Sequence, residues 1–216
     1  MLSMNIEKAY DKWAETYDVM SNKTRDMDLI ATNENLGHTK FHSILEIGCG
    51  TGKNTQWLAH RCSKLVAVDF SKEMMSIAKQ KVIETHVEWL QFDVSLPWPL
   101  QRTQFDLITF NLVLEHVRDL DFVFAQAASR LAKGGMIHLS ELHPFKQYLG
   151  SKARFESEQG VHEVEAFTHH ISDYTTALSA AGCPLLELKE WFDRDRNEIP
   201  RLLTMIATAG QSTKQY

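Results

Sequence analysis

Residues 44–52 read Ile-Leu-Glu-Ile-Gly-Cys-Gly-Thr-Gly, an apolar run that passes into three glycines at alternate positions. The segment 42–47 is typical of a buried strand, and residues 53–59 after the glycines begin a helical pattern. A strand, a glycine-rich turn and a helix form the nucleotide-binding corner of a doubly wound α/β sheet. Glycine suits such a turn because it accepts positive φ and lets a ligand approach the backbone.

The register of the glycines bears on the ligand. The dinucleotide fingerprint G-x-G-x-x-G needs a third glycine where this chain has Lys53, and the glycine here is Gly52 instead. Glu46 stands two residues before the first glycine, Gly48. A carboxylate beside the turn would repel a diphosphate and would suit a ligand that carries positive charge. An NAD-dependent oxidoreductase is therefore the less favoured alternative.

Acidic residues follow the next two predicted strands. Residues 64–69 form the second strand and end in Asp69, about 20 residues after the turn, where a carboxylate can accept hydrogen bonds from both ribose hydroxyls. Residues 87–92 form the third strand, and Asp93 follows it. In one sheet, Asp69 lies at the same carboxyl edge as the glycine turn.

Several strings together resemble one family. The pattern E-x-G-x-G-x-G at residues 46–52 resembles motif I of the class I S-adenosylmethionine-dependent methyltransferases, in particular the small-molecule domains of types 11 and 12. The strings Y-x-x-x-A-x-x-Y-D at residues 10–18, D-x-S-x-x-M at 69–74 and F-D-L-I followed by L-E-H-V within 105–117 resemble the same family. The resemblance covers nearly the whole chain and is strongest from 44 to 141.

The resemblance implies an α/β fold with one Rossmann-like, doubly wound sheet of seven strands, mostly parallel with an antiparallel last strand. Residues 1–216 then form a single domain, in which residues 1–40 are a helical cap and residues 142–172 are an insertion on the substrate side. Beyond the elements above, we expect helices at residues 4–20, about 24–37, 119–133 and 172–182, and strands at residues 105–110, 136–141, 185–192 and 202–209.

The cofactor implied by the resemblance is S-adenosyl-L-methionine, with S-adenosyl-L-homocysteine as its product. Asp69 would hold the ribose, Asp93 the adenine amino group, and the N–H of Val94 a ring nitrogen. The N-terminal helix would close over the ligand. The cofactor-binding residues implied in this way are Tyr17, Glu46, Gly48, Gly50, Gly52, Asp69, Phe70, Met74, Asp93, Val94, Asn111 and Leu112.

The implied reaction is in-line methyl transfer from a sulfonium to an O or N atom of a small molecule. Because the methyl group is already electrophilic, the protein must mainly bind, orient and exclude water. A base could help with an oxygen or protonated-amine acceptor. The candidate bases are Glu115, His116, Glu141, His143, His169 and His170, and His143 and His116 are the catalytic candidates. The expected substrate-binding residues are Tyr10, Trp13, Glu141, His143, Tyr148 and Arg154.

Composition and charge argue against several other classes of protein. A chain of 216 residues that is 44% hydrophobic can bury one α/β core, and its net charge of −5 argues against a broad nucleic-acid surface. Three widely spaced cysteines without a C-x-x-C pair indicate reduced thiols. The N-terminus lacks the apolar core of a signal peptide, and no apolar run approaches the ~20 residues of a membrane helix. We therefore expect a cytoplasmic protein, a monomer or homodimer, with no nucleic-acid or membrane partner.

The sequence bears on three further alternatives. Four histidines cluster between 143 and 170, but they lack H-x-x-x-H spacing and companion cysteines, so we expect no metal. An S-adenosylmethionine-binding regulatory or partner module would bind without turnover. A methyltransferase acting on a macromolecule is disfavoured because residues 111–114 read Asn-Leu-Val-Leu, not the Asn/Asp-Pro-Pro-aromatic motif of enzymes that methylate nucleic-acid amino groups. The acceptor itself has no signature in the sequence.

Overall fold

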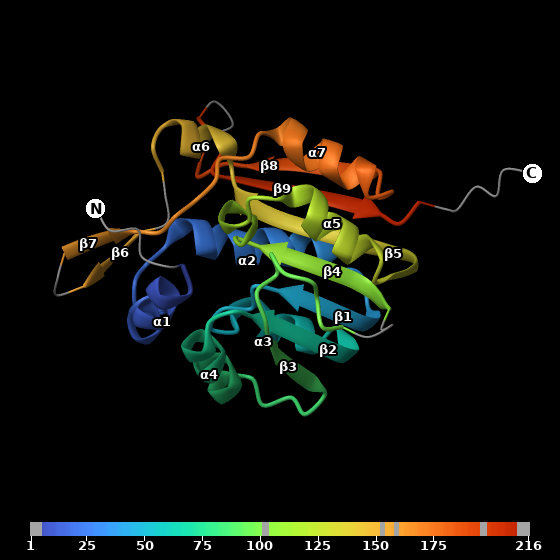
Figure 1. Cartoon of the computed structure of the whole chain (residues 1–216), viewed down its shortest axis with the longest axis horizontal. Helices are drawn as coiled ribbons and strands as arrows, with labels where there is room; N and C mark the ends of the chain where they lie inside the picture. The colour runs from blue at the N-terminus through green and yellow to red at the C-terminus, as the bar shows by residue number, and fades with distance from the viewer. Residues whose placement is uncertain (1–5, 101–103, 152–153, 158–159, 195–197, 211–216) are drawn as a thin grey trace, which may run out of the picture.

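The protein was analysed as a computed structural model, which describes residues 6–100, 104–151, 154–157, 160–194 and 198–210, with the backbone alone for 154–157 and 160–163. Seven strands form one sheet in the order β3-β2-β1-β4-β5-β9-β8 (Figure 1). Their bounds are β1 Phe41–Ile47, β2 Cys62–Asp69, β3 Val87–Gln91, β4 Phe105–Asn111, β5 Leu131–Leu142, β8 Leu185–Trp191 and β9 Leu202–Thr208. The last strand, β9, is antiparallel to both of its neighbours, and the pairs from β3 to β5 are parallel. The predicted sheet is confirmed.

Helices cover both faces of this sheet. Their bounds are α1 Ile6–Tyr17, α2 Lys23–Leu36, α3 Lys53–Ala59, α4 Lys72–Lys81, α5 Leu120–Ala128, α6 Pro144–Tyr148 and α7 Ile171–Ala180, with a 3₁₀ turn, η1, at Leu114–His116. Helices α5 and α7 pack together in front of the sheet in Figure 1, and residues of α2 and α3 pack against its other face. Helix α1 packs against α4 near the carboxyl ends of the strands.

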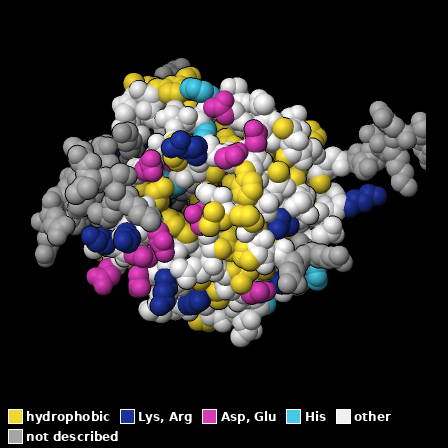
Figure 2. Space-filling model, in the orientation of Figure 1, with side chains coloured by type: hydrophobic (Ala, Val, Ile, Leu, Met, Phe, Trp, Pro, Cys, Tyr) yellow, Lys and Arg dark blue, Asp and Glu magenta, His cyan; other side chains and the backbone are white. Residues whose placement is uncertain are grey.

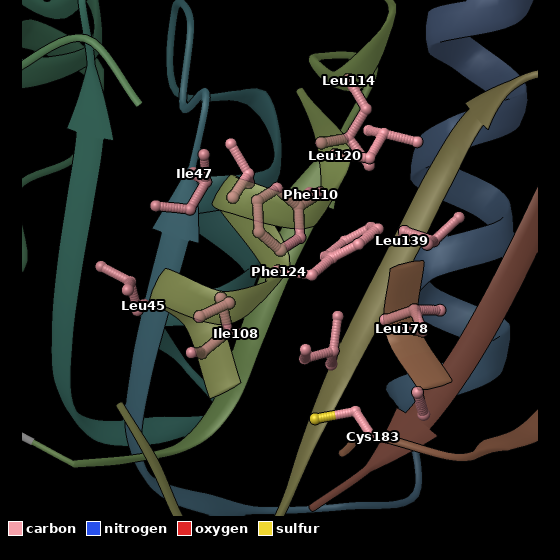
Figure 3. Packing of buried hydrophobic residues seen from close by; sticks show 14 of the residues in the cluster. Leu45, Ile47, Ile108, Phe110, Leu114, Leu120, Phe124, Leu139, Leu178 and Cys183 are labelled. Carbon is pink, nitrogen blue, oxygen red and sulfur yellow. The ribbon is translucent and has the colours of Figure 1, made fainter. Parts of the chain in front are cut away.

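The strands are apolar on both faces because both faces are covered. Along β1, Ile47 joins the cluster under α5 and α7, and Ile44 joins the cluster under α2 and α3. This division follows from the alternation of side chains along a strand. Figure 3 shows Phe110 of β4 against Phe124 of α5, with ring centroids 5.7 Å apart in an edge-to-face arrangement.

Short polar residues cap the starts of α2, α4 and α5. Ser71 accepts a hydrogen bond from the N–H of Met74 at the start of α4, and Asp119 accepts one from the N–H of Phe122 at the start of α5. Each side chain satisfies an amide that the helix itself leaves unpaired. Asn22 begins α2 in the same way.

The end of α5 differs from the prediction. The helix ends at Ala128 rather than Lys133, and β5 begins at Leu131, which pairs with Phe105 of β4. The register between these strands shifts after Phe105, and Gly134 inside β5 has a φ of 76°. Gly134 and Gly135 therefore lie at an irregularity within β5 and do not follow the end of a helix. The pairing of β5 with β4 overrides the local helical preference of this segment.

Residues 142–172, the expected insertion on the substrate side, contain α6 and a hairpin. Strands β6 (Arg154–Ser157) and β7 (Gly160–Glu163) pair antiparallel outside the main sheet (Figure 1). Val164, just after β7, is buried in a cluster with Trp13 of α1 and Met74 of α4. The segment after β7 is therefore packed against the N-terminal helix. No helix in the described ranges combines the length and the apolar character needed to cross a membrane.

Candidate active site

The strand order reverses between β1 and β4, and the turns after these two strands touch. A Cβ on Gly48 would lie 2.8 Å from Cγ2 of Val113, and Gly48 has a φ of 74°. Both conditions exclude other residues at this position. A Cβ on Gly50 would meet nothing within 4 Å, so this part of the backbone faces open space. In open α/β sheets ligands bind at such a reversal, beyond the carboxyl ends of the strands.

A cavity of about 390 Å³ lies at this edge. It is lined by the turns after β1, β2, β3 and β4 and by residues of α1. The structure brings together most of the predicted cofactor-binding residues, and those that line the cavity are Tyr17, Gly48, Gly50, Asp69, Phe70, Met74, Asp93, Val94, Asn111 and Leu112. Gly52 instead precedes α3, and Glu46 lies within β1. The lining residues that the sequence did not single out are Ile6, Glu7, Gln91, Phe92, Ser95, Val113 and Val117.

Asp69 joins two turns of the cavity wall. Its Oδ2 accepts a hydrogen bond of 2.7 Å from the N–H of Gly50, and its Oδ1 accepts one of 2.8 Å from the N–H of Ser71. Burial raises the pKa of Asp69 to about 6, and the backbone hydrogen bonds hold it from rising further. Asp93 also lines the cavity, and its Oδ1 accepts a hydrogen bond of 2.8 Å from the N–H of Ser95, which closes a local turn.

Glu141 of β5 holds the turn after β4. Its Oε1 accepts hydrogen bonds from the N–H groups of Val113 (3.1 Å) and Leu114 (2.9 Å). Leu112, between the two strands' ends, has a φ of 54°, a conformation that costs a non-glycine residue about 1–2 kcal/mol. Its N–H donates to the carbonyl of Ser140 at 2.8 Å. A strained residue held by surrounding hydrogen bonds is a feature of ligand sites.

A second cavity of about 190 Å³ adjoins the first. Tyr10, Tyr17 and Leu112 line both cavities. The other residues that line the second cavity are Trp13, Asn22, Thr24, Arg25, Glu115, Leu142, Ser151 and Arg201. Two cavities that share lining residues can hold two molecules side by side.

Residues 45–139 match a protein family described as a methyltransferase domain. This match covers less than half of the chain, and the curated and structural neighbours of the chain are class I S-adenosylmethionine-dependent methyltransferases. The malonyl-(acyl-carrier protein) O-methyltransferase of Priestia megaterium is 31% identical over 140 residues, which cover 62% of this chain and 50% of that protein. The ubiquinone biosynthesis O-methyltransferase of Coxiella burnetii is 29% identical over 180 residues, which cover 73% of this chain and 74% of that protein. This chain thus matches half the length of the first of these methyltransferases.

Solved methyltransferase structures share the fold. DhpI in complex with S-adenosylhomocysteine superimposes with a TM-score of 0.76 at 23% identity, over 95% of both chains. The N-methyltransferase NodS of Bradyrhizobium japonicum, in complex with S-adenosyl-L-homocysteine, gives 0.74 at 18% identity, over 96% of this chain and 100% of that one. At these identities the likeness concerns the fold alone.

Glu46 is not among the residues that line the first cavity. Its side chain is buried within β1, and burial raises its pKa to about 8. Burial therefore favours the neutral form of Glu46 and weakens the repulsion between Glu46 and a diphosphate that was inferred from the sequence.

Tyr10 of α1 and His116 of η1 are joined over the first cavity. Nδ1 of His116 lies 2.7 Å from the carbonyl oxygen of Glu165, so this nitrogen carries the proton and donates it. Nε2 of His116 is then free to accept the hydroxyl proton of Tyr10, 2.8 Å away. Burial raises the pKa of Tyr10, so its hydroxyl keeps that proton. His116, a catalytic candidate, thus lines the cavity and ties α1 to the turn after β4.

The other predicted residues lie partly outside the cavities. His143 is buried before α6, where Nδ1 accepts from the N–H of Phe145 and Nε2 donates to Glu190 at 3.0 Å. The Tyr148 hydroxyl lies 2.6 Å from Nδ1 of His170. The remaining candidates lie as follows: Trp13 and Glu115 line the second cavity, Glu141 holds the turn after β4, His169 lies 2.7 Å from the carbonyl of Val117, and the side chain of Arg154 falls outside the described part.

The three cysteines of the chain, Cys49, Cys62 and Cys183, are free thiols. Among the side chains that the structure describes, no three His, Cys, Asp or Glu residues form a metal-binding group.

The Tyr10→Phe variant is expected to lower the free energy of unfolding by about 0.5–1.5 kcal/mol, because it removes a part-buried hydrogen bond and leaves Nε2 of His116 without its donor. Urea unfolding at pH 7 measures the change. Tyr148→Phe is the matched control, since it removes the hydroxyl of a half-exposed tyrosine and is expected to change stability by no more than about 0.5 kcal/mol. Equal stability losses in the two variants would contradict the role of the Tyr10–His116 bond.

Proposed function

We propose that this chain is an enzyme that uses S-adenosylmethionine to methylate an O or N atom of a small molecule. The observation that carries the proposal is the cavity at the reversal of strand order, where the glycine turn, Asp69 and Asp93 line one space. The adjoining smaller cavity is the place for the acceptor. The match of residues 45–139 to a methyltransferase domain supports the choice of cofactor.

The residues of the first cavity fit this cofactor. Its volume of about 390 Å³ falls in the range of small-molecule sites, roughly 300–1,000 Å³. The open space over Gly50 allows a ligand to contact the backbone directly. Asp69 would accept the ribose hydroxyls, Asp93 and the N–H of Val94 would meet the adenine edge, and Met74 would lie against the ring. When bound, the cofactor supplies a methyl group made electrophilic by a sulfonium.

The chain's own residues bind, orient and exclude water. Tyr10, Tyr17 and Leu112 form the wall between the two cavities, so they set where the acceptor meets the methyl group. The hydrogen bond between Tyr10 and His116 keeps α1 closed over this wall. Holding two reactants in a fixed geometry can account for roughly 7–11 kcal/mol of a barrier, so positioning is the main catalytic effect that we propose.

Asp69→Ala is expected to raise the dissociation constant for S-adenosylhomocysteine about 10- to 100-fold, since a charged acceptor of hydrogen bonds contributes about 1.5–3 kcal/mol. Isothermal titration calorimetry measures this constant. Asp121→Ala, which removes an exposed acid on α5, is the control and should bind as the wild type does. Unchanged affinity in Asp69→Ala would contradict the ribose role. Tight binding of NADH without binding of S-adenosylhomocysteine would contradict the proposed function as a whole.

The alternatives differ in measurable ways. Binding of the cofactor without turnover against a broad acceptor panel would favour a regulatory or partner module. On the face shown in Figure 2, acidic and basic side chains are interspersed, which offers a nucleic acid little continuous positive surface. The names of the relatives, O-methyltransferases and an N-methyltransferase, leave both acceptor atoms open. We further propose that residues 1–216 form one cytoplasmic domain, a monomer or homodimer, with residues 1–40 as its cap and 142–172 as the substrate-side insertion.

A further inference from the structure

The second cavity has a charge pattern that bears on its ligand. Among the described residues that line it, the charged ones are Arg25 of α2, Arg201 just before β9, and Glu115. Its volume of about 190 Å³ is about half that of the first cavity, so a ligand held there is small. A charged group on that ligand would lie near these three side chains.

Arg25 presents a fixed positive charge to the cavity. Its Nη1 and Nη2 donate to the carbonyl oxygens of Tyr17 (2.5 Å) and Met20 (2.7 Å), which are neutral groups. Its guanidinium carbon lies 4.0 Å from the centre of the Tyr17 ring, and this contact helps to hold the guanidinium group in place. Only 9% of the residue is exposed, and Nε has no hydrogen-bond partner among the described residues. A buried cation whose bonds go to neutral groups favours an anion nearby.

Arg201 uses one edge of its guanidinium for an acid on the protein. Nε and Nη2 donate to the two oxygens of Asp193, at 2.5 and 2.6 Å, and hold the pKa of that carboxyl below its usual range. The third nitrogen, Nη1, makes only a longer contact of 3.2 Å with the hydroxyl of Thr24, another residue of the cavity wall. This nitrogen can donate to a ligand while the pair with Asp193 stays intact.

Burial lessens the opposition of Glu115 to an anion in this position. Glu115 is 7% exposed, and its Oε2 has no hydrogen-bond partner among the described residues. Burial raises the pKa of Glu115 and so favours its neutral form. A protonated carboxyl can donate a hydrogen bond to an oxyanion, whereas two guanidinium groups would repel an ammonium.

We infer that the acceptor held in the second cavity is a small oxyanion, such as a carboxylate or a phosphonate, whose negative group lies between Arg25 and Arg201. This inference rests on the proposed function. An oxyanion attacks the methyl carbon with an oxygen lone pair, the electrons of the broken methyl–sulfur bond stay on sulfur, and no proton is released. Such an acceptor needs no general base, in agreement with a second cavity in which neither His116 nor His143 takes part.

Calorimetry on the protein saturated with S-adenosylhomocysteine tests the inference. The titrants are acetate, benzoate and methylphosphonate, with acetamide, benzamide and benzylamine as matched neutral and cationic molecules. At least one oxyanion is expected to bind about 10-fold or more tightly than its neutral counterpart. Comparison of acetate and benzoate with methylphosphonate shows which of the two kinds of oxyanion binds more tightly. Equal binding of acids and amides, or stronger binding of the amine, would overturn the inference.

Two variants of one ion pair sharpen the test. Arg201→Gln removes the cation and is expected to weaken oxyanion binding about 10-fold. Asp193→Asn removes the acid that neutralises Arg201, so it is expected to tighten oxyanion binding. A purely structural role for the pair predicts loss of binding in both variants, because both break the same ion pair, and that result would overturn the inference.

Failure of the proposed function gives a different signal. If the wild type did not bind S-adenosylhomocysteine, the cofactor assignment would be wrong whatever the acids do. Both variants are expected to keep wild-type affinity for S-adenosylhomocysteine, since neither Arg201 nor Asp193 lines the first cavity. Cofactor binding together with indifference to the charge of the second ligand would refute the oxyanion alone.

Discussion

Alanine in place of Gly48 is expected to raise the dissociation constant for S-adenosylhomocysteine more than about 100-fold. Two costs add at this position. A φ of 74° strains any residue with a Cβ by about 1–2 kcal/mol. The new Cβ would also lie 2.8 Å from Cγ2 and 2.9 Å from Cβ of Val113, so the turns after β1 and β4 would have to separate. Separation of the two turns would change the wall of the cofactor cavity, which both residues line.

The double variant Gly48→Ala with Val113→Ala separates the two costs. It removes both Cγ atoms of Val113, the nearer being the 2.8 Å contact, and leaves the strain in φ, so it is expected to recover part of the lost affinity. Calorimetry gives the affinity, and thermal unfolding followed by circular dichroism shows whether each variant is folded. A single variant that is folded and binds like the wild type would contradict the steric argument. A double variant no better than the single one would exclude the Cγ atoms of Val113 as the cause.

Most of the fold and of the cofactor site can be predicted from local sequence patterns. The glycine turn, the acids at 69 and 93, and the residues after β4 each follow a strand directly, and a parallel sheet gathers such positions at one edge. A residue's place in the chain therefore fixes its place in the site. The structure accordingly puts Gly48, Asp69 and Asn111 around one cavity.

The acceptor side has no such local signal. Arg201 reaches Thr24 across 177 residues of sequence, and nothing near either residue marks them as neighbours. His143 and Glu141 lie just beyond or at a strand end, as a substrate contact would. Yet His143 forms a hydrogen bond with Glu190, 47 residues away, and Glu141 accepts a hydrogen bond from the turn after β4. Side-chain direction and long-range partners decide these roles, and a strand pattern contains neither.

Glu46→Gln is expected to flatten part of the pH dependence of stability. Burial raises the pKa of Glu46 from 4.5 to about 8 in the folded protein. Between these values the unfolded chain releases a proton that the folded chain keeps, so the unfolded state binds fewer protons and stability falls as pH rises. The stability contributed by the neutral carboxyl is complete below about pH 4.5 and is lost as pH approaches 8. A shift of this size corresponds to roughly 5 kcal/mol.

Urea unfolding of the two proteins at intervals from pH 5 to 8.5 measures this effect. Glutamine keeps the shape of the neutral carboxyl and cannot ionise, so the variant is expected to match the wild type near pH 5 and to exceed its stability by several kcal/mol above pH 8. Burial also raises the pKa of Glu141 and Asp28, so a residual slope of the same sign remains in the variant. Glu73→Gln, at an exposed position of α4, is the control and should leave the wild-type curve unchanged. Parallel curves for wild type and Glu46→Gln would show that Glu46 is ionised in the folded protein, and the sequence-based repulsion of a diphosphate would then apply after all.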